Sequence, residues 1–221
     1  MVAPFSYEDV GIDLGVSHFG ALSTGDFIDN PRHYRRAEKR VKKLQEAVSR
    51  KKRGSHRRKK AVQAVAKAHR TIRNQRQDFL HKQSRILVNR YQVIVFEDLQ
   101  TTNLIKRPKP KQNEDGAYLP NGAAAKAGLN KSMSDAGWSH FVQLCTYKAA
   151  WAGRTLVHVD PKYTSQVCSG CGAIVKKDLS ERWHSCECGT ELDRDTNAAK
   201  NILKRGLQQL SVGTRPTRAT A

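Results

Sequence analysis

Two short apolar runs, each with an acidic residue at its end, constrain the fold of this chain most. Asp13 lies near the end of the run 10–14, and Glu97 directly follows the run 93–96. Apolar runs of this length are typical of buried β-strands, where a carboxylate is costly to desolvate unless a positive charge compensates it. A third acid, Asp195, opens a stretch of small residues with helical character. We therefore expect a fold that gathers carboxylates around a divalent cation.

The remaining segments predict an α/β chain in which strands and helices alternate and the acids stand at strand ends. Gly54 and Ser55 interrupt the long helical pattern, which predicts a helical hairpin. The expected elements are a strand meander within 7–29, helices within 32–90, a strand at 92–97, a helix at 136–153, a strand at 156–159 and a helix at about 196–204.

Two further segments have compositions that do not predict regular structure. Residues 106–132 are rich in Pro, Gly, Asn and Lys, and we expect a long mobile loop there. A structureless loop of this length inside a domain is uncommon and is often functional. The last residues, 211–221, are expected to be disordered.

The three acids indicate metal-dependent chemistry on a nucleic-acid phosphodiester. Two cations about 3.5–4 Å apart can activate a water molecule and stabilise the departing oxygen, and Asp13 is the best candidate to bridge them because it belongs to the sheet. The alternative is that Asp13 and Glu97 are turn residues and that Asp195 is a helix N-cap. Spacing alone leaves both interpretations open. Asp160 is a further candidate ligand, although a turn before a proline also explains it.

Four of the five cysteines predict a structural zinc site. They form two close pairs separated by 14 residues, similar to the four-thiolate zinc ribbon, and are Cys168, Cys171, Cys186 and Cys188. Four protein ligands leave no open position for catalysis, so the zinc would hold together a small hairpin that has no core of its own. His184 is a reserve ligand, and free thiols are the alternative. Cys145 lies on an apolar helical face and is expected to pack in the core.

The charge of the chain indicates a polyanionic partner. The 221 residues carry a net charge of +20 and the isoelectric point is about 10.1. Residues 32–60 contain 15 Lys or Arg, opposed only by Glu38 and Glu46, so the predicted helices repel themselves unless a polyanion lies against them. The expected nucleic-acid contacts, which position a backbone without reading its bases, are Lys39, Arg40, Lys43, Arg50, Lys51, Lys52, Arg53, Arg57, Arg58, Lys59 and Lys60.

The sequence also bears on the compartment. No apolar run approaches the roughly 20 residues that cross a bilayer, and residues 1–9 lack the layout of a secretory signal. An odd number of cysteines in paired clusters is typical of a metal site and not of a disulfide framework. We expect a soluble intracellular protein that is not associated with a membrane.

Five motifs follow one another along the chain. They are Gly11-Ile12-Asp13-Leu14-Gly15, Phe96-Glu97-Asp98-Leu99, Ser134-Asp135-Ala136-Gly137-Trp138, Thr164-Ser165-Gln166-Val167-Cys168-Ser169-Gly170-Cys171-Gly172 and Asp193-Arg194-Asp195-Thr196-Asn197-Ala198-Ala199. Together they resemble the C-terminal half of TnpB, the RNA-guided nuclease of the OrfB transposase family, which is related to the compact type V CRISPR effectors. The resemblance covers about residues 9–206, and it implies a cytoplasmic, nucleoid-associated protein of a bacterium or archaeon.

The resemblance implies an RNase H-like fold of the RuvC type, with an inserted basic helical hairpin and a zinc ribbon before the last acid. It implies that Asp13, Glu97 and Asp195 are catalytic and hold Mg²⁺ or Mn²⁺, with Asp195 a better match than Asp193. It also places the zinc on the four paired cysteines, although the second pair is one residue shorter than usual. The implied divisions are a nuclease domain at 1–164, with the hairpin at 32–90, a zinc ribbon at 165–190, a final RuvC segment at 191–210 and the tail.

One departure from the family bears on function. The first acid already stands at position 13, so we expect the N-terminal half that grips guide RNA and reads a short DNA motif to be missing or supplied by another chain. The leading hypothesis is a transposon-associated, Mg²⁺-dependent DNA endonuclease domain, acting on DNA with a guide RNA in the family context. The alternatives are a catalytically silent protein that binds transposon RNA or DNA, and a zinc-ribbon RNA-binding protein. The complete set of three acids favours the first.

Overall fold

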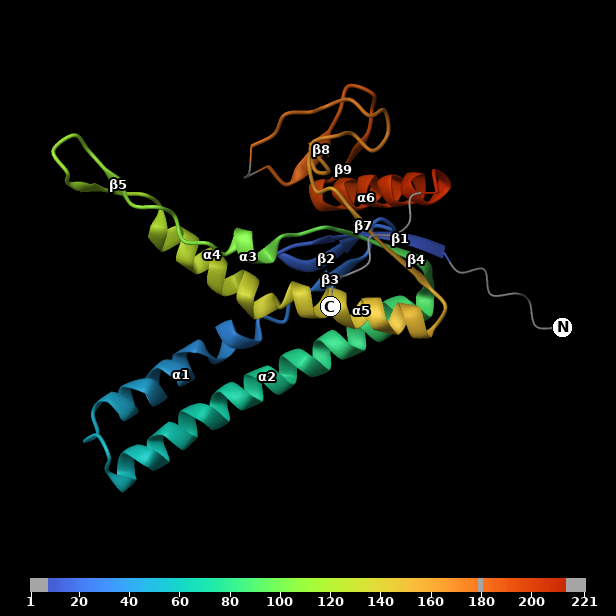
Figure 1. Ribbon diagram of the computed structural model, residues 1–221. Coiled ribbons are helices and arrows are strands. Elements are labelled where there is room, and N and C mark those ends of the chain that lie inside the picture. The colour runs from blue at the N-terminus through green and yellow to red at the C-terminus, as the bar shows by residue number, and fades with distance from the viewer. Residues whose placement is uncertain (1–7, 179–180, 214–221) are drawn as a thin grey trace. The chain divides into compact units, whose positions relative to one another are not determined.

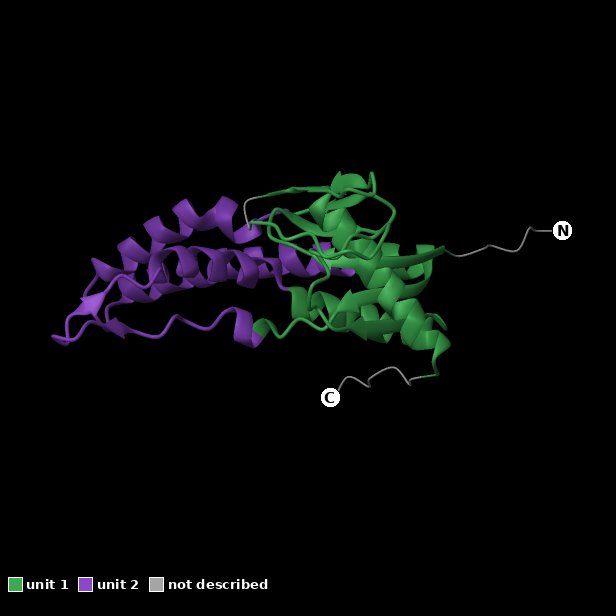
Figure 2. Cartoon of the chain, turned by 90° about the horizontal axis from the view of Figure 1, so that it is seen from above, with its two compact units in different colours: residues 1–30, 83–101, 138–221 green, residues 31–82, 102–137 purple. Residues whose placement is uncertain are grey.

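The computed structural model describes residues 8–178 and 181–213. The chain divides into two compact units: a first unit of residues 1–30, 83–101 and 138–221, and a second of residues 31–82 and 102–137 (Figure 2). Among the described residues, no helix is long and apolar enough to cross a membrane. The tail predicted to be disordered lies, from residue 214 onward, outside the described residues, and Ser211 is the last residue of a helix.

A five-stranded mixed sheet forms the centre of the first unit (Figure 1). Its order is β3-β2-β1-β4-β7; β1, β2 and β3 pair antiparallel, and β4 and β7 run parallel to β1. The predicted meander and both predicted central strands are therefore confirmed. The strands are β1 (Glu8–Leu14), β2 (His18–Leu22), β3 (Phe27–Asp29), β4 (Tyr91–Glu97) and β7 (Thr155–Val159).

Two helices cover opposite faces of this sheet (Figure 1). On one face lies α5 (Trp138–Trp151), whose buried Phe141 ring meets the rings of Phe19 and Phe96 edge-on at 4.9 and 6.0 Å. The other face carries α6 (Arg194–Ser211), which begins close to the predicted start but extends further than expected. Its Ile202 packs with buried valines of β4 and β7.

Glycines allow α6 to approach the sheet at backbone distance. A Cβ atom on Gly11 of β1 would lie 2.2 Å from the carbonyl oxygen of Ala199 and 2.5 Å from the backbone nitrogen of Leu203. On the helix side, a Cβ on Gly206 would lie 2.5 Å from a methyl carbon of Val95 in β4. The absence of a side chain at these two positions therefore sets the distance between α6 and the two central strands.

The second unit contains the predicted helical hairpin. It consists of α1 (His33–Ser49) and most of α2 (His56–Arg90), which run antiparallel, and Gly54 adopts a φ of +81° in the turn between them. The hydroxyl of Ser55 accepts a hydrogen bond from the Arg58 N–H at 3.2 Å and so caps the start of α2.

The prediction of one structureless loop at 106–132 is wrong. The segment contains a small hairpin of β5 (Lys111–Gln112) and β6 (Tyr118–Leu119), and then α4 (Ala123–Ala136). The turn residues Gly116 and Gly122 explain the loop-like composition, but the alanine-rich start of α4 has the strongest intrinsic helix propensity. A short helix, α3 (Thr101–Leu104), precedes this segment.

Asp135 joins the helices of the second unit. Helix α1 begins after Arg32, which has a left-handed conformation and does not cap the helix with its side chain. The carboxylate of Asp135, near the end of α4, instead accepts hydrogen bonds from the backbone N–H groups of Tyr34 at 2.9 Å and Arg35 at 3.3 Å. It also accepts one from the guanidinium of Arg76 on α2 at 3.0 Å. One buried acid therefore satisfies the open end of α1 and holds three helices together.

We predict that Gly11→Ala lowers the free energy of unfolding by about 1–3 kcal/mol, because the added methyl group must displace the backbone of α6. Chemical denaturation measures this change. Gly128→Ala is the control: Gly128 lies within α4, and its nearest neighbouring atom would be 4.0 Å away, so alanine should stabilise the helix or leave it unchanged. Equal stability of the Gly11→Ala and wild-type proteins would contradict the proposed close contact.

Candidate functional site

Strand alternation places Asp13 and Glu97 on one face of the sheet. Side chains two residues apart in a strand point to the same face. Asp13 therefore points to the same face as Gly11, and Glu97 points to the same face as Val95. Both Gly11 and Val95 contact α6. Strands β1 and β4 are parallel neighbours with Ile12 opposite Phe96, so the two acids follow at adjoining positions. Both carboxylates thus face the helix that carries the third acid.

The two acids at the start of α6, Asp193 and Asp195, have different roles. The N-cap is Asp193, whose carboxylate accepts hydrogen bonds from the N–H groups of Asp195 at 2.8 Å and Thr196 at 3.2 Å. The alternative that Asp195 is the N-cap is therefore wrong. Asp195 stands in the first turn, where its carboxylate lies 3.7 Å from Arg194 Nε and 4.0 Å from Arg182 Nη1.

The electrostatics of the three acids show that they converge. Burial raises the pKa of Asp13 well above its ordinary value, and the charges of Glu97 and Asp195 raise it further. Burial also raises the pKa of Glu97, while a hydrogen bond from Thr164 and the charge of Arg205 oppose this rise. The charges of Glu97 and Asp195 therefore act unfavourably on an ionised Asp13, and a bound cation would relieve this repulsion.

The carboxylate oxygen atoms of these three acids do not lie close enough together to form a set of metal ligands. Within the described part of the chain, the cysteine cluster is the only group of three or more His, Cys, Asp or Glu whose ligand atoms all lie within 4.8 Å of one another. The acids share one side of the sheet and interact through their charges, whereas the sulfur atoms are already in direct contact.

Sequence reasoning missed the residue that orients Glu97. The hydroxyl of Thr164, a buried residue in the turn after β7, donates a hydrogen bond to a carboxylate oxygen of Glu97. The Thr164 carbonyl in turn accepts a hydrogen bond from Asn201 of α6 at 2.9 Å. Thr164 belongs to the sequence motif that includes the first cysteine pair, and this motif was the only sign of its importance in the sequence. Only the folded chain places it beside an acid 67 residues away.

Three residues on one side of α6 hold the segment between β7 and the cysteines. The amide of Asn197 donates to the carbonyl of Val167 at 2.7 Å and accepts from the N–H of Ser169 at 2.9 Å. Asn201 donates to the same Val167 carbonyl at 2.6 Å, and Arg205 holds two carbonyls earlier in the segment. Asp160 belongs to this turn: its carboxylate accepts from the backbone of Lys162, as the turn interpretation expected, and its charge raises the pKa of Glu97.

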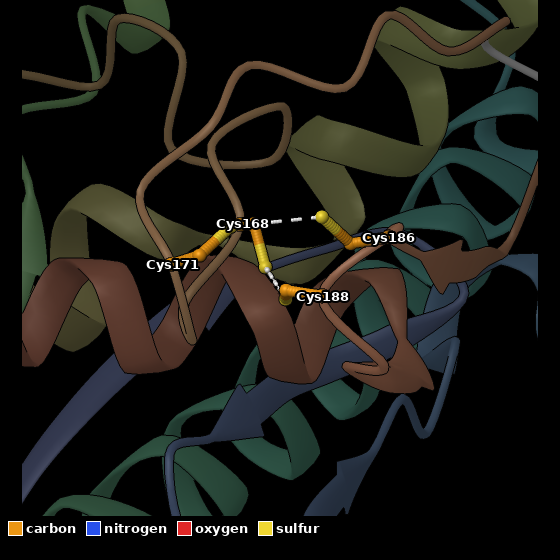
Figure 3. A group of neighbouring side chains, drawn as sticks. All are labelled: Cys168, Cys171, Cys186 and Cys188. Carbon is orange, nitrogen blue, oxygen red and sulfur yellow. Dashed lines mark hydrogen bonds between the residues drawn. The ribbon is translucent and has the colours of Figure 1, made fainter.

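The four predicted zinc cysteines lie together (Figure 3). The sulfur atoms of Cys168 and Cys188 are 3.6 Å apart, as are those of Cys171 and Cys186, and all four thiols are free. Tetrahedral zinc with bonds of about 2.3 Å requires sulfur atoms about 3.8 Å apart. The donor set and its spacing therefore fit a four-thiolate zinc site. The second pair lies in the turn between β8 (Trp183–Ser185) and β9 (Glu191–Asp193).

The surroundings of Cys168 favour its thiolate form. Burial raises the pKa of Cys168, but hydrogen bonds from the Cys171 backbone and from other nearby groups outweigh burial and lower this pKa to about 5. His184 is fully buried in β8, and the four sulfur atoms gather without it. Cys145 lies in the core, where burial raises its pKa strongly, as expected for a packing residue.

The basic residues predicted to contact nucleic acid lie on α1, on α2 and in the turn between them. Nine of these eleven side chains are exposed, and only Lys51 and Arg58 are half-buried. Unlike a surface helix with interspersed acids, α1 carries only Glu38 and Glu46, and Glu38 pairs with Arg35 and Lys131. The exposed face therefore keeps most of its positive charge.

Two family models match separate segments of the chain. A family model described as "Cas12f1-like, TNB domain" matches residues 138–202, and the model OrfB_IS605, described as "Probable transposase", matches residues 4–107. The chain belongs to the OrfB family of transposon-encoded proteins, the TnpB family.

Individual relatives agree with this assignment. The chain is 42% identical, over 96% of its length and 48% of the relative's, to a Streptomyces pristinaespiralis protein named "Putative RNA-guided DNA endonuclease". It is 34% identical, over 92% of its length and 50% of the relative's, to the Escherichia coli K12 protein "Putative RNA-guided DNA endonuclease InsQ". The chain therefore spans about half the length of these relatives.

Solved structures support the mixed α/β fold. One similar chain comes from the cryo-EM structure of the Cas12f1–sgRNA–target DNA complex, with a TM-score of 0.53, 16% identity and coverage of 88% of this chain and 49% of that one. Another comes from a CRISPR-Cas12f ternary complex, with a TM-score of 0.56, 18% identity and coverage of 92% and 40%. At these identities the similarity concerns the fold alone.

We predict one zinc ion per chain, bound by the four clustered cysteines. Cys168→Ser should lose the metal and increase hydrogen exchange across residues 165–178, because the ribbon has little core of its own. Cys145→Ala, which removes a buried thiol outside the cluster, should retain it. Elemental analysis after gentle purification measures the zinc, and a metal-free wild-type protein would contradict the assignment.

Proposed function

We propose that this chain is the nuclease domain of a transposon-associated DNA endonuclease, with an RNase H-like fold of the RuvC type. One observation carries the proposal: three acids from β1, β4 and α6 face one another, and burial together with the charges of Glu97 and Asp195 raises the pKa of Asp13. A strongly perturbed carboxyl group among other acids is typical of a catalytic site. The mixed sheet, and its similarity in fold to Cas12f1 chains, support the RuvC assignment.

In this proposal Asp13, Glu97 and Asp195 hold Mg²⁺ or Mn²⁺. Such cations would polarise the scissile phosphate and lower the pKa of a bound water. Asp13 would be the ligand that the two cations share, because both other carboxylates act on it. Thr164 holds the Glu97 carboxylate in one orientation through its hydrogen bond, and Asp193 caps α6 so that Asp195 stands in the first turn.

DNA is the proposed substrate, with a guide RNA as partner in the working complex. The relatives' names describe RNA-guided DNA endonucleases, and a similar fold occurs in a complex with guide RNA and target DNA. The exposed lysines and arginines of α1 and α2 would hold nucleic-acid phosphates. A complementing N-terminal half belongs to the same proposal, and co-purification with this chain would test it.

We predict that the purified protein nicks single-stranded DNA slowly in Mg²⁺ or Mn²⁺. Asp13→Ala, Glu97→Gln and Asp195→Asn should each reduce nicking below detection, because each removes one ligand from a shared metal cluster. Asp193→Asn is the matched control, since asparagine caps a helix about as well as aspartate and nicking should persist. Undiminished nicking by the Asp13→Ala protein would contradict the proposal, and a wild-type protein that binds DNA without nicking would favour the silent binding alternative.

A stability measurement tests the same acids without cleavage. The folded state binds the Asp13 proton more tightly than the unfolded state, so the metal-free protein should lose stability as pH rises from the ordinary carboxyl range through the raised pKa. Asp13→Asn should remove this loss and raise the melting temperature at neutral pH, by about 2–4 °C for each kcal/mol of stability gained. Mn²⁺ should stabilise the wild type but not the variant in a thermal melt.

We predict that the basic hairpin of α1 and α2 binds DNA with an affinity that falls with salt and without sequence preference. Replacing four exposed residues with Gln, namely Lys39, Lys43, Lys52 and Arg57, should weaken DNA binding and lower the slope of log affinity against log salt by about one for each phosphate that these side chains neutralise. The charge-matched control replaces Lys106, Arg107, Lys109 and Lys111, also exposed but outside the hairpin. Fluorescence anisotropy at several salt concentrations measures the slope. Equal slopes for the two variants would show that the hairpin makes no special contribution.

A further inference from the structure

The turn between β7 and the cysteines contains a strained residue. Tyr163 has a φ of +62°, in the left-handed region that bulky residues rarely adopt. Glycine takes this conformation without steric cost. A tyrosine at such a position therefore indicates a functional role for its ring, because glycine would adopt the same backbone conformation without strain.

The surrounding turn holds this conformation from both sides. Arg205 of α6 donates hydrogen bonds to the carbonyls of Asp160 at 2.7 Å and Lys162 at 2.8 Å, immediately before the tyrosine. The Tyr163 carbonyl accepts a hydrogen bond from the N–H of Val167 at 3.0 Å, after it. The direction in which the chain presents the Tyr163 side chain is therefore fixed by the fold.

Packing does not account for the ring, because Tyr163 is 50% exposed. The ammonium group of Lys162 lies 5.2 Å from the ring centroid. Proteins hold single-stranded nucleic acid with exposed aromatic rings next to positive charges, so that a base stacks on the ring and the cation meets a phosphate. Because the Lys162 ammonium lies over one face of the Tyr163 ring, a base would stack on the opposite face.

The position of the ring connects it with the acids. Thr164, the next residue, donates its hydroxyl to Glu97. The exposed ring therefore stands one residue from a group in contact with the acid site, on the same rigid turn.

We propose that Tyr163 is a base-stacking residue that binds a nucleobase of the single DNA strand entering the acid site, with Lys162 contacting a neighbouring phosphate. The proposal rests on the proposed function for the identity of the strand. It adds a binding position for a base, independent of base identity because every base has an aromatic face.

Binding of a fluorescent single-stranded DNA, without added divalent cation and without a chelator that would remove zinc, tests the proposal. Tyr163→Ala should weaken binding by about fivefold to a hundredfold, the range for removal of one stacked base. Tyr163→Phe should bind as the wild type does, because the ring is retained. Tyr163→Gly should bind as weakly as Tyr163→Ala but unfold at an equal or higher denaturant concentration, because it relieves the backbone strain.

Two controls separate stacking from other effects. Trp151 is 81% exposed and precedes β7, whereas Tyr163 follows it, so Trp151→Ala removes an exposed ring from the other end of the strand and should leave binding unchanged. A strand of the same length with abasic sites keeps its phosphates but has no bases to stack. The wild type should bind it more weakly than the complete strand, and Tyr163→Ala should reduce this difference.

The outcomes distinguish this proposal from the proposed function. Wild-type affinity in Tyr163→Ala, indifference of the wild type to the abasic strand, or an equally weakened affinity in Tyr163→Phe would each overturn the stacking role. The nuclease assignment instead depends on the acid variants and on metal-dependent nicking, which the metal-free binding measurement does not involve.

Discussion

The close contact between α6 and the central strands is the constraint on which the site depends. Because Gly11 has no side chain, the backbone of α6 reaches β1, and Gly206 allows the same approach to β4. Asp13 and Glu97 share the strand face that meets this helix, so the contact determines whether they can act together with Asp195. A bulkier residue at either glycine would separate the helix from the strands before it affected any acid directly.

The same helix connects the acids with the cysteines. The side of α6 formed by Asn197, Asn201 and Arg205 holds the segment that leads from β7 into the zinc ribbon. Within that segment, the hydroxyl of Thr164 donates a hydrogen bond to the carboxylate of Glu97. A zinc ion that orders the ribbon would therefore also stabilise the turn that orients a proposed catalytic acid, although the two groups of ligands are separate.

Two sets of like charges in this protein are unfavourable until a partner binds. Burial and, after it, the charges of Glu97 and Asp195 raise the pKa of Asp13, and the basic residues of α1 have few acids to pair with. A divalent cation would relieve the first repulsion and a nucleic-acid backbone the second. Such sites lower the stability of the unbound protein, a recurrent consequence of functional design. Both features therefore support the proposed metal-dependent action on nucleic acid.

The sequence by itself determined the features that depend on local pattern. Apolar runs predicted the strands, a glycine break predicted the hairpin, and cysteine spacing predicted the sulfur cluster. The tertiary structure decided what depends on contacts between distant residues: that Asp193 and not Asp195 caps α6, that Thr164 bonds to Glu97, and that Asp135 caps α1 across 101 residues. Hydrogen bonds of this kind leave no periodic trace in the sequence, because their geometry exists only after the helices have packed.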